Sequence, residues 1–214
     1  MSSVALIGAT GLVGRHCLDL LASDRSFERI VVIARRKFAE AMAPRVEGHI
    51  VDMDRLAERP DLFAVDQVIC ALGTTIKAAG SQDRFRQVDH GIPLAAARAA
   101  RRQAARHFLL VSALGASARS RIFYSRVKGE LEEALGTLGF PRLTILRPSL
   151  LIGERDEIRL GEEVAKRFGW ALPGKYRPVH ARDVAKVLVM CAKEGESGIR
   201  IIESDEIRER ARSG

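Results

Sequence analysis

The stretch Val4-Ala5-Leu6-Ile7-Gly8-Ala9-Thr10-Gly11-Leu12-Val13-Gly14 decides how this chain folds. Its first four residues are apolar, which is typical of a short strand buried on both faces. Three glycines, each three residues after the last, follow at once, and glycine allows a tight turn and a close approach of the backbone to a pyrophosphate. We therefore predict a strand-to-helix turn that binds a dinucleotide. The alternative is a tight turn with a purely structural role.

The helix after this turn is expected from about residue 12 to residue 21. Its N-terminal end carries a partial positive charge, which favours a phosphate group. The glycine spacing alone is a weak motif, because a chain with 18 glycines can contain it by chance. Its position, between a strand and a helix at the start of a βαβ pattern, makes it informative. The residues of the turn that we expect at the cofactor are Gly8, Thr10, Gly11, Leu12, Val13 and Gly14.

Six further runs of strand length follow the first, and most are apolar throughout. Helical patterns lie between most of them, which predicts a parallel sheet with helices on both faces. We expect an α/β fold, a Rossmann-type doubly wound parallel sheet. The predicted strands are residues 4–7, 30–33, 49–51, 67–71, 107–111, 143–146 and 199–202.

We expect residues 1–214 to form a single NAD(P)-binding domain, because no repeat, linker or low-complexity tract interrupts the pattern. A small lid-like substrate segment is predicted at about residues 150–180. Within it, Phe168 and Trp170 would form an apolar wall, and a core role for both aromatic residues is the alternative.

Composition restricts the possible partners. The three cysteines stand far apart without a CxxC spacing, which favours reduced core residues and no metal site. We expect no membrane segment and no export, because no apolar stretch reaches the required length and no basic leader is present. The net charge is +8, but the basic residues are dispersed among 27 acidic ones, which favours a solvated surface over nucleic-acid binding. The expected protein is cytoplasmic and either a monomer or a homodimer.

The second strand ends in Ala34-Arg35-Arg36-Lys37, where an NAD-preferring fold would carry an acidic residue for the ribose 2′-hydroxyl. Alanine removes the repulsion toward a 2′-phosphate, and guanidinium groups suit a phosphate. We therefore predict NADP(H) as the cofactor, bound through Arg35 and Arg36. An exposed basic turn is the alternative.

The third and fourth strands end in further candidates for cofactor contact. Asp52 is placed to accept a hydrogen bond from the adenine amino group, with Met53 flanking the ring, and a turn or helix-cap role for Asp52 is the alternative. The fourth strand leads into a stretch of mostly small residues, and we expect Ala71, Leu72 and Gly73 to let the backbone pass under the ribose and the diphosphate. The Ala-rich segment 82–105 then predicts a long helix that Pro93 kinks or breaks.

The fifth strand ends at Ser112, and Tyr124 and Lys128 follow at the start of an amphipathic helix. Residues four apart share one helix face, so the ammonium would favour the phenolate and bring the tyrosine pKa toward neutral pH. Lys128 would also hold the nicotinamide ribose, and the Ser112 hydroxyl would orient a substrate carbonyl. A surface tyrosine beside a solvated lysine is the alternative.

Together these motifs resemble the short-chain dehydrogenase/reductase superfamily, within it the atypical branch of Tat-interacting-protein-like NAD(P)-binding oxidoreductases. The resemblance implies Tyr124 as proton donor, Lys128 as its pKa-lowering and ribose-binding partner, and Ser112 as the residue that orients the carbonyl. It also implies that four residues border the nicotinamide. The motifs are Gly8-x-x-Gly11-x-x-Gly14, Ala34-Arg35-Arg36-Lys37, Cys70-Ala71-Leu72-Gly73-Thr74-Thr75, Ser112, Tyr124-x-x-x-Lys128-Gly129-Glu130 and Leu146-Arg147-Pro148-Ser149-Leu150-Leu151. The four bordering residues are Pro148, Ser149, Leu150 and Leu151.

Two features depart from the resemblance. Many members of the superfamily use an asparagine to support the lysine, and this chain contains no asparagine. Where relatives often have paired serines, this chain has Ser112 followed by Ala113, with Ser117 as a distant substitute. The first departure means that any proton relay must run differently.

We therefore predict an NADPH-dependent oxidoreductase that reduces a small carbonyl or quinone-like acceptor. The alternative is an NADP(H)-binding regulatory protein that senses redox state without turnover, because fold alone does not fix function.

Overall fold

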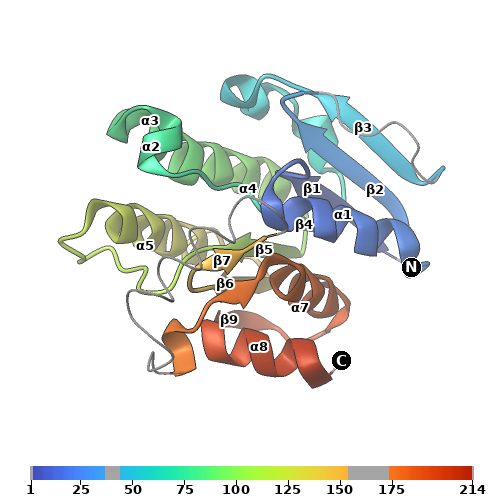
Figure 1. Ribbon diagram of the computed structural model, residues 1–214. Coiled ribbons are helices and arrows are strands. Elements are labelled where there is room, and N and C mark those ends of the chain that lie inside the picture. The colour runs from blue at the N-terminus through green and yellow to red at the C-terminus, as the bar shows by residue number, and fades with distance from the viewer. Residues whose placement is uncertain (1, 37–43, 154–173, 214) are drawn as a thin grey trace.

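The computed structural model describes residues 2–36, 44–153 and 174–213, and a seven-stranded parallel sheet lies at its centre (Figure 1). The predicted α/β fold, a Rossmann-type doubly wound sheet with helices on both faces, is confirmed. Each of the seven predicted strands is present. They are β1 (Ser2–Ile7), β2 (Phe27–Ala34), β3 (Val46–Ile50), β4 (Gln67–Cys70), β5 (His107–Val111), β6 (Arg142–Arg147) and β9 (Gly198–Glu203).

The strand order is β3-β2-β1-β4-β5-β6-β9, so the direction of winding reverses between β1 and β4. Both neighbours of β1 run parallel to it, and Ile7 at its end lies beside Ile33 of β2 and Cys70 of β4. In open α/β sheets, ligands bind outside the carboxyl ends of the strands at such a reversal. The glycine turn that follows Ile7 begins at this point.

Helices cover both faces because side chains alternate along each buried strand. Val4 and Leu6 face a core formed with α1 (Leu12–Ser23), α7 (Ala181–Lys193) and α8 (Ser204–Ser213). Ala5 and Ile7 face the opposite core. Figure 1 shows α1 and α7 side by side over the first face, in agreement with their extensive contact. The second face is covered by the short helices η1 (Met53–Glu58) and η2 (Pro60–Phe63) and by α4 (Ile92–Arg102) and α5 (Phe123–Gly136).

The long Ala-rich helix predicted over residues 82–105 is present as an uninterrupted run of helical turns over residues 82–102, and before Pro93 it widens into a π turn rather than breaking. After the short helix α2 (Ile76–Ala79), α3 spans Gln82–Arg86, and a π-helical turn, η3, spans Gln87–Gly91 and leads into α4. Within η3 the N–H of Ile92 donates to the carbonyl of Gln87, five residues earlier. Proline lacks an N–H and clashes with the carbonyl four residues before it, which here belongs to Asp89. The wider turn at Asp89 accommodates Pro93.

A second, two-stranded parallel sheet pairs β7 (Leu151–Ile152) with β8 (Val179–His180), close to the short helix η5 (Gly174–Tyr176) in the chain. We did not predict these strands, because two residues are too few to show a periodicity. The predicted lid of residues 150–180 overlaps this sheet. Most of it, including Phe168 and Trp170, lies outside the described residues.

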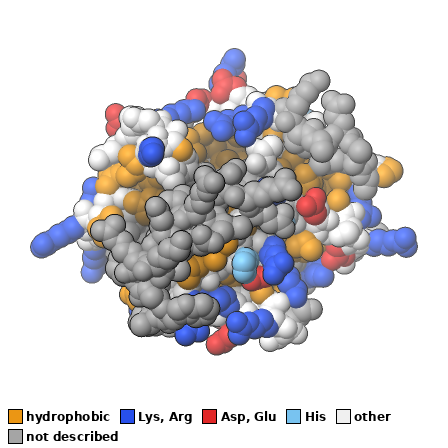
Figure 2. All heavy atoms as spheres, viewed as in Figure 1, with side chains coloured by type: hydrophobic (Ala, Val, Ile, Leu, Met, Phe, Trp, Pro, Cys, Tyr) orange, Lys and Arg blue, Asp and Glu red, His pale blue; other side chains and the backbone are white. Residues whose placement is uncertain are grey.

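Lys and Arg side chains appear at separate points around the face drawn in Figure 2, with acidic side chains among them. Among residues 2–36, 44–153 and 174–213, no helix combines the length and the apolar character that a membrane crossing needs.

Candidate functional site

The glycine turn after β1 has a geometry that only glycine permits at two positions. Gly8 has a φ of +90°, and a Cβ there would lie 2.7 Å from the carbonyl oxygen of Ala71. A Cβ at Gly14 would lie 2.0 Å from the carbonyl oxygen of Gly8. The Gly11 N–H donates to that same oxygen at 2.9 Å. The three glycines therefore bring the start of α1 directly against the ends of β1 and β4.

The first turn of α1 is suited to an anion. Its N-cap, Gly11, makes no side-chain hydrogen bond, and the first turn contains no acidic residue. The backbone N–H groups of a helix start bind phosphates when no side chain caps them. Thr10 and Gly11 are exposed at the turn, whereas the side chain of Val13 lies in the core, so Val13 can contribute only its backbone. These residues fit the diphosphate of a dinucleotide.

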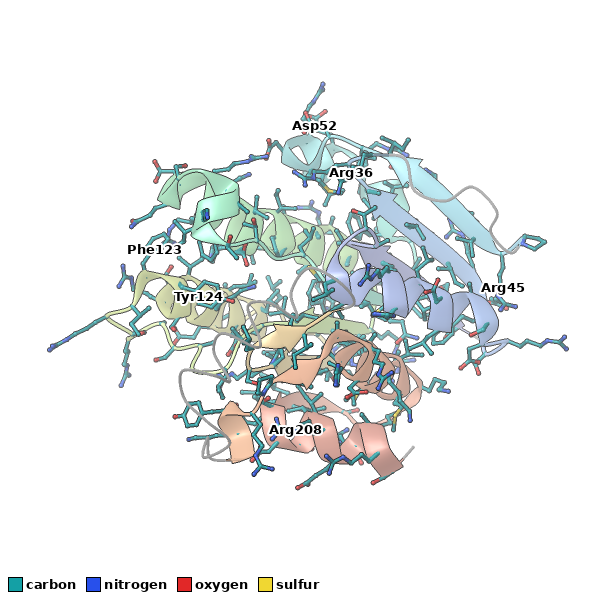
Figure 3. The ribbon with its side chains drawn as sticks, viewed as in Figure 1. Arg36, Arg45, Asp52, Phe123, Tyr124 and Arg208 are labelled. Carbon is teal, nitrogen blue, oxygen red and sulfur yellow. The ribbon has the colours of Figure 1, made fainter. Side chains whose placement is uncertain are left out.

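The ends of β2 and β3 present the residues predicted for the ribose and adenine. Arg35 and Arg36 are both exposed directly after β2. Figure 3 shows Arg36 and Asp52 in the same region, at the ends of these neighbouring strands. The Asp52 carboxylate accepts a hydrogen bond from the backbone N–H of Asp54 at 3.0 Å and caps η1. This is the helix-cap role that the sequence offers as the alternative to adenine binding. Met53 is 5% exposed and packs in the core, so its predicted place beside the adenine ring needs correction.

The segment after β4 links the glycine turn to α5. The Ala71 N–H donates to the carbonyl of Ile7 at 2.9 Å, and Ala71 and Leu72 are half-buried. Gly73 is exposed, and a Cβ there would lie 4.0 Å from Nζ of Lys128. The structure therefore brings the backbone of residues 71–73 between the glycine turn and the predicted catalytic lysine.

Tyr124 and Lys128 lie one turn apart on α5, as predicted. Lys128 is buried, and its Nζ lies 2.7 Å from Oδ1 of Asp89, whose side chain is fully buried. The other carboxylate oxygen of Asp89 accepts from the backbone N–H of Thr74 at 3.0 Å. The Tyr124 ring packs on Phe85 of α3 with ring centroids 5.4 Å apart, and Figure 3 shows Tyr124 on α5.

The charges around Tyr124 differ from the prediction. Burial raises the pKa of the Tyr124 phenol and the Asp89 carboxylate adds to this effect, so the nearby Lys128 ammonium does not lower it overall. Burial alone would lower the pKa of Lys128, but Asp89 and Tyr124 outweigh it, and the pKa is raised. Our expectation of a tyrosine pKa lowered toward neutral pH was wrong, because burial of the phenol, with the Asp89 carboxylate adding to it, outweighs the Lys128 ammonium. Tyr124 is therefore protonated at neutral pH.

The Ser112 hydroxyl is directed at a carboxylate inside the protein. Ser112 is buried at the end of β5, and its hydroxyl donates to the Glu132 carboxylate. Arg147 Nε also donates to that carboxylate, at 3.1 Å. Glu132 lies eight residues after Tyr124, about 12 Å further along the helix axis. The structure thus joins Ser112 to the middle of α5 and to the end of β6, and its predicted role as the residue that orients the carbonyl needs correction.

The segment after β6 contains the four residues predicted to border the nicotinamide. Pro148 is buried, and its carbonyl accepts from the Leu114 N–H at 2.9 Å. Ser149 uses both its polar groups internally, since its N–H donates to Ser204 Oγ at 3.1 Å and its hydroxyl donates to a loop carbonyl. Leu150 is 39% exposed, and Leu151 is half-buried in β7. Of these four residues, Leu150 presents the most apolar surface.

Sequence reasoning missed two residues of the site. Asp89 is separated from Lys128 by helix α4, strand β5 and two loops, so no local spacing shows the pair. The one available signal was a carboxylate four residues before the predicted helix break at Pro93. Phe85 was also missed, because a buried aromatic residue in a helix usually indicates the core.

Comparisons with known proteins agree with this geometry. The family described as NAD(P)H-binding matches residues 8–195. Protein fmp52, mitochondrial, of Emericella nidulans is 41% identical over 178 residues, which cover 80% of this chain and 76% of that protein. Protein HTATIP2 of Rattus norvegicus is 35% identical over 189 residues, which cover 87% of this chain and 78% of that protein.

Solved structures show the same fold at low sequence identity. MoeE5 in complex with UDP-glucose and NAD has a TM-score of 0.72 and 13% identity, covering 99% of this chain and 81% of that one. UDP-glucose 4-epimerase from Thermotoga maritima has a TM-score of 0.68 and 14% identity, covering 98% of this chain and 80% of that one. At such identities the likeness concerns the fold alone.

The relatives correct one prediction. Fmp52 proteins of Emericella nidulans, Candida albicans and Lodderomyces elongisporus are named as mitochondrial. These names contradict the cytoplasmic location expected from the sequence, and that prediction is wrong.

Proposed function

Because the chain belongs to the NAD(P)H-binding family of short-chain dehydrogenase/reductase-like proteins, we propose that it is an NADPH-dependent oxidoreductase that reduces a small carbonyl or quinone-like acceptor. The family match supports a nicotinamide cofactor. The reaction, the preference for NADPH and the roles of individual residues are the proposal.

One observation carries the proposal: a tyrosine and a lysine on one face of α5 lie where the segment after β4 meets that helix. A Cβ at Gly73 would lie 4.0 Å from Lys128 Nζ, and the carbonyl oxygen of Ala71 lies against Gly8 of the glycine turn. The residues proposed for cofactor contact and the proposed proton donor thus lie at the same edge of the sheet.

The residues have separate roles in the proposed reaction. When bound, the reduced nicotinamide supplies a hydride to the carbonyl carbon. Tyr124 Oη donates its proton to the carbonyl oxygen, so the C=O bond becomes a C–H and an O–H bond, and solvent reprotonates Tyr124. A phenol that is protonated at neutral pH is in the form a proton donor requires. Lys128 holds the ribose hydroxyls and keeps a positive charge near the developing oxyanion.

The preference for NADPH rests on the end of β2. Ala34 is buried and uncharged, and it occupies the position where NAD-preferring folds carry an acidic residue. The two arginines that follow it are exposed. Arginine suits a phosphate better than lysine does, because its planar group donates two parallel hydrogen bonds.

Replacement of Tyr124 by Phe tests the proposal. The variant keeps the ring that packs on Phe85 and loses only the hydroxyl. We expect NADPH binding to be unchanged and carbonyl-dependent NADPH oxidation to fall by about 100-fold or more. Tyr176→Phe, which removes the other tyrosine of the chain, is the matched control and should leave turnover unchanged.

Undiminished turnover in Tyr124→Phe would remove the assigned role. If wild-type protein binds NADPH but oxidises it with no acceptor in a broad panel, and the bound cofactor alters capture of a protein partner, the regulatory alternative replaces the reductase proposal.

A further inference from the structure

The π-helical turn before α4 places the Asp89 carboxylate against Lys128. Asp89 is 1% exposed, and its two oxygens reach different elements, Nζ of Lys128 on α5 and the backbone N–H of Thr74 after β4. π turns inside helices often occur at functional sites. Pro93 explains this one locally, because the carbonyl that a proline obstructs belongs to Asp89.

We propose that Asp89 is the positioning residue of this site: its carboxylate holds the Lys128 ammonium charged and in place against the end of β4, and so sets the protonation state of the Tyr124–Lys128 pair. The inference rests on the proposed reductase function for its consequence in catalysis, while the contacts themselves do not depend on a substrate. It also accounts for a chain that lacks any asparagine to support the lysine.

The groups that face Asp89 can be named from each packed element. Lys128 and Tyr124 face it from α5, and Cys70 faces it from β4. Burial raises the pKa of the Cys70 thiol to about 11, so it is neutral near pH 7. The nearby Glu130 of α5 pairs with Arg86 at 2.6 Å instead. Asp89 is thus the carboxylate that compensates the lysine.

This compensation suits reduction. An uncompensated buried ammonium would either stabilise the phenolate of Tyr124 or lose its own proton. Both outcomes remove a proton that the reaction needs, one from the donor and the other from the cation beside the oxyanion. With the Asp89 carboxylate 2.7 Å from Lys128 Nζ, both protons are retained at neutral pH.

The test replaces Asp89 by Asn, which retains an oxygen for the Thr74 N–H but removes the charge. Electrophoretic mobility measures net charge and needs no substrate or cofactor. If Asp89 sets the protonation state, the Tyr124–Lys128 pair in Asp89→Asn loses a proton at lower pH, whichever residue loses it. The net charge of Asp89→Asn should then exceed that of wild type by one elementary charge at about pH 7, and this excess should fall toward zero as the pH rises to about 10.

Asp83→Asn is the matched control, because Asp83 lies in the same segment but is exposed. Its charge difference from wild type should stay at one over the whole range. An Asp89→Asn difference that also stays at one would overturn the proposal. In the enzymatic arm, the pH at which kcat declines on the alkaline side should fall by about one unit or more in Asp89→Asn. An unchanged alkaline limb would likewise overturn it.

If Asp89→Asn fails to fold, circular dichroism measures whether the double variant Asp89→Asn/Lys128→Met recovers the fold. Recovery of the fold supports the proposal, because the uncompensated ammonium was then the cause. Failure to recover overturns it in favour of a purely structural Asp89. Wild-type protein that reduces no acceptor would refute the proposed function without changing the electrophoretic result.

Discussion

Replacement of Gly14 by Ala tests the geometry on which cofactor binding depends. The new Cβ would lie 2.0 Å from the carbonyl oxygen of Gly8, 2.6 Å from its carbonyl carbon and 3.0 Å from Cα of Ala9. All three atoms belong to the backbone, so no side chain can rotate away. The start of α1 must therefore move away from the end of β1.

The magnitude follows from two opposing effects. Overpacking against rigid neighbours costs about 3 kcal/mol, whereas alanine in place of glycine inside a helix contributes about 1 kcal/mol. We expect the free energy of unfolding to fall by about 2 kcal/mol, which for a chain of this length lowers Tm by about 4–8 °C. NADPH affinity should fall by about tenfold or more, because the helix start that faces the diphosphate is displaced.

Urea unfolding followed by circular dichroism and NADPH titration followed by fluorescence measure both effects. Gly136→Ala is the matched control, because a Cβ there would meet only Ile199 Cδ1, at 3.7 Å. That variant should be as stable as wild type or slightly more so and should bind NADPH normally. A Gly14→Ala protein with wild-type stability and affinity would refute the reasoning.

Three further predictions follow from the contacts. Arg35→Ala/Arg36→Ala should lower NADPH affinity by about tenfold or more and leave NADH affinity unchanged, and equal affinities in wild type would contradict the assignment. Ser112→Ala should lower the free energy of unfolding by about 1.5–3 kcal/mol through Glu132 while turnover stays within about threefold, and a large loss of turnover at normal stability would restore the role predicted from the sequence. Burial and the nearby Arg142 lower the pKa of His107 from 6.5 to about 3, so the neutral form is favoured in the folded state. Stability is then lost as the pH falls below about 6.5, by about 2.7 kcal/mol at about pH 4.5, and His107→Gln should flatten that part of a Tm-against-pH profile.

The fold was predictable because the strands are buried on both faces. Val4 to Ile7 and Gln67 to Cys70 are fully or almost fully buried, and their apolar composition follows directly from that burial, with Gln67 as the polar exception. The glycine turn was predictable as well, because Gly8 and Gly14 meet backbone atoms that allow no Cβ. By contrast, β7 and β8 contain two residues each, and strands this short leave no pattern in a sequence.

The candidate site was predictable where its residues are close in the chain. Tyr124 and Lys128 are four residues apart, so helix geometry alone places them on one face. The partners that determine their charge and direction come from distant segments. Asp89 contacts Lys128 from the π turn, and Ser112 turns toward Glu132, whose carboxylate is buried beside Arg147. The sequence therefore indicated which groups matter but not how they are paired.

The most direct measurement follows deuterium from NADPH labelled at both C4 positions of the nicotinamide into a panel of small carbonyl and quinone acceptors. The account predicts that wild-type protein yields an alcohol or quinol and, for carbonyl acceptors, that the product carries one deuterium on the former carbonyl carbon. Tyr124→Phe should bind the labelled NADPH equally well and yield little of that product. Bound NADPH that yields neither a deuterium-labelled alcohol nor a quinol, or equal product formation by wild type and Tyr124→Phe, would contradict the account.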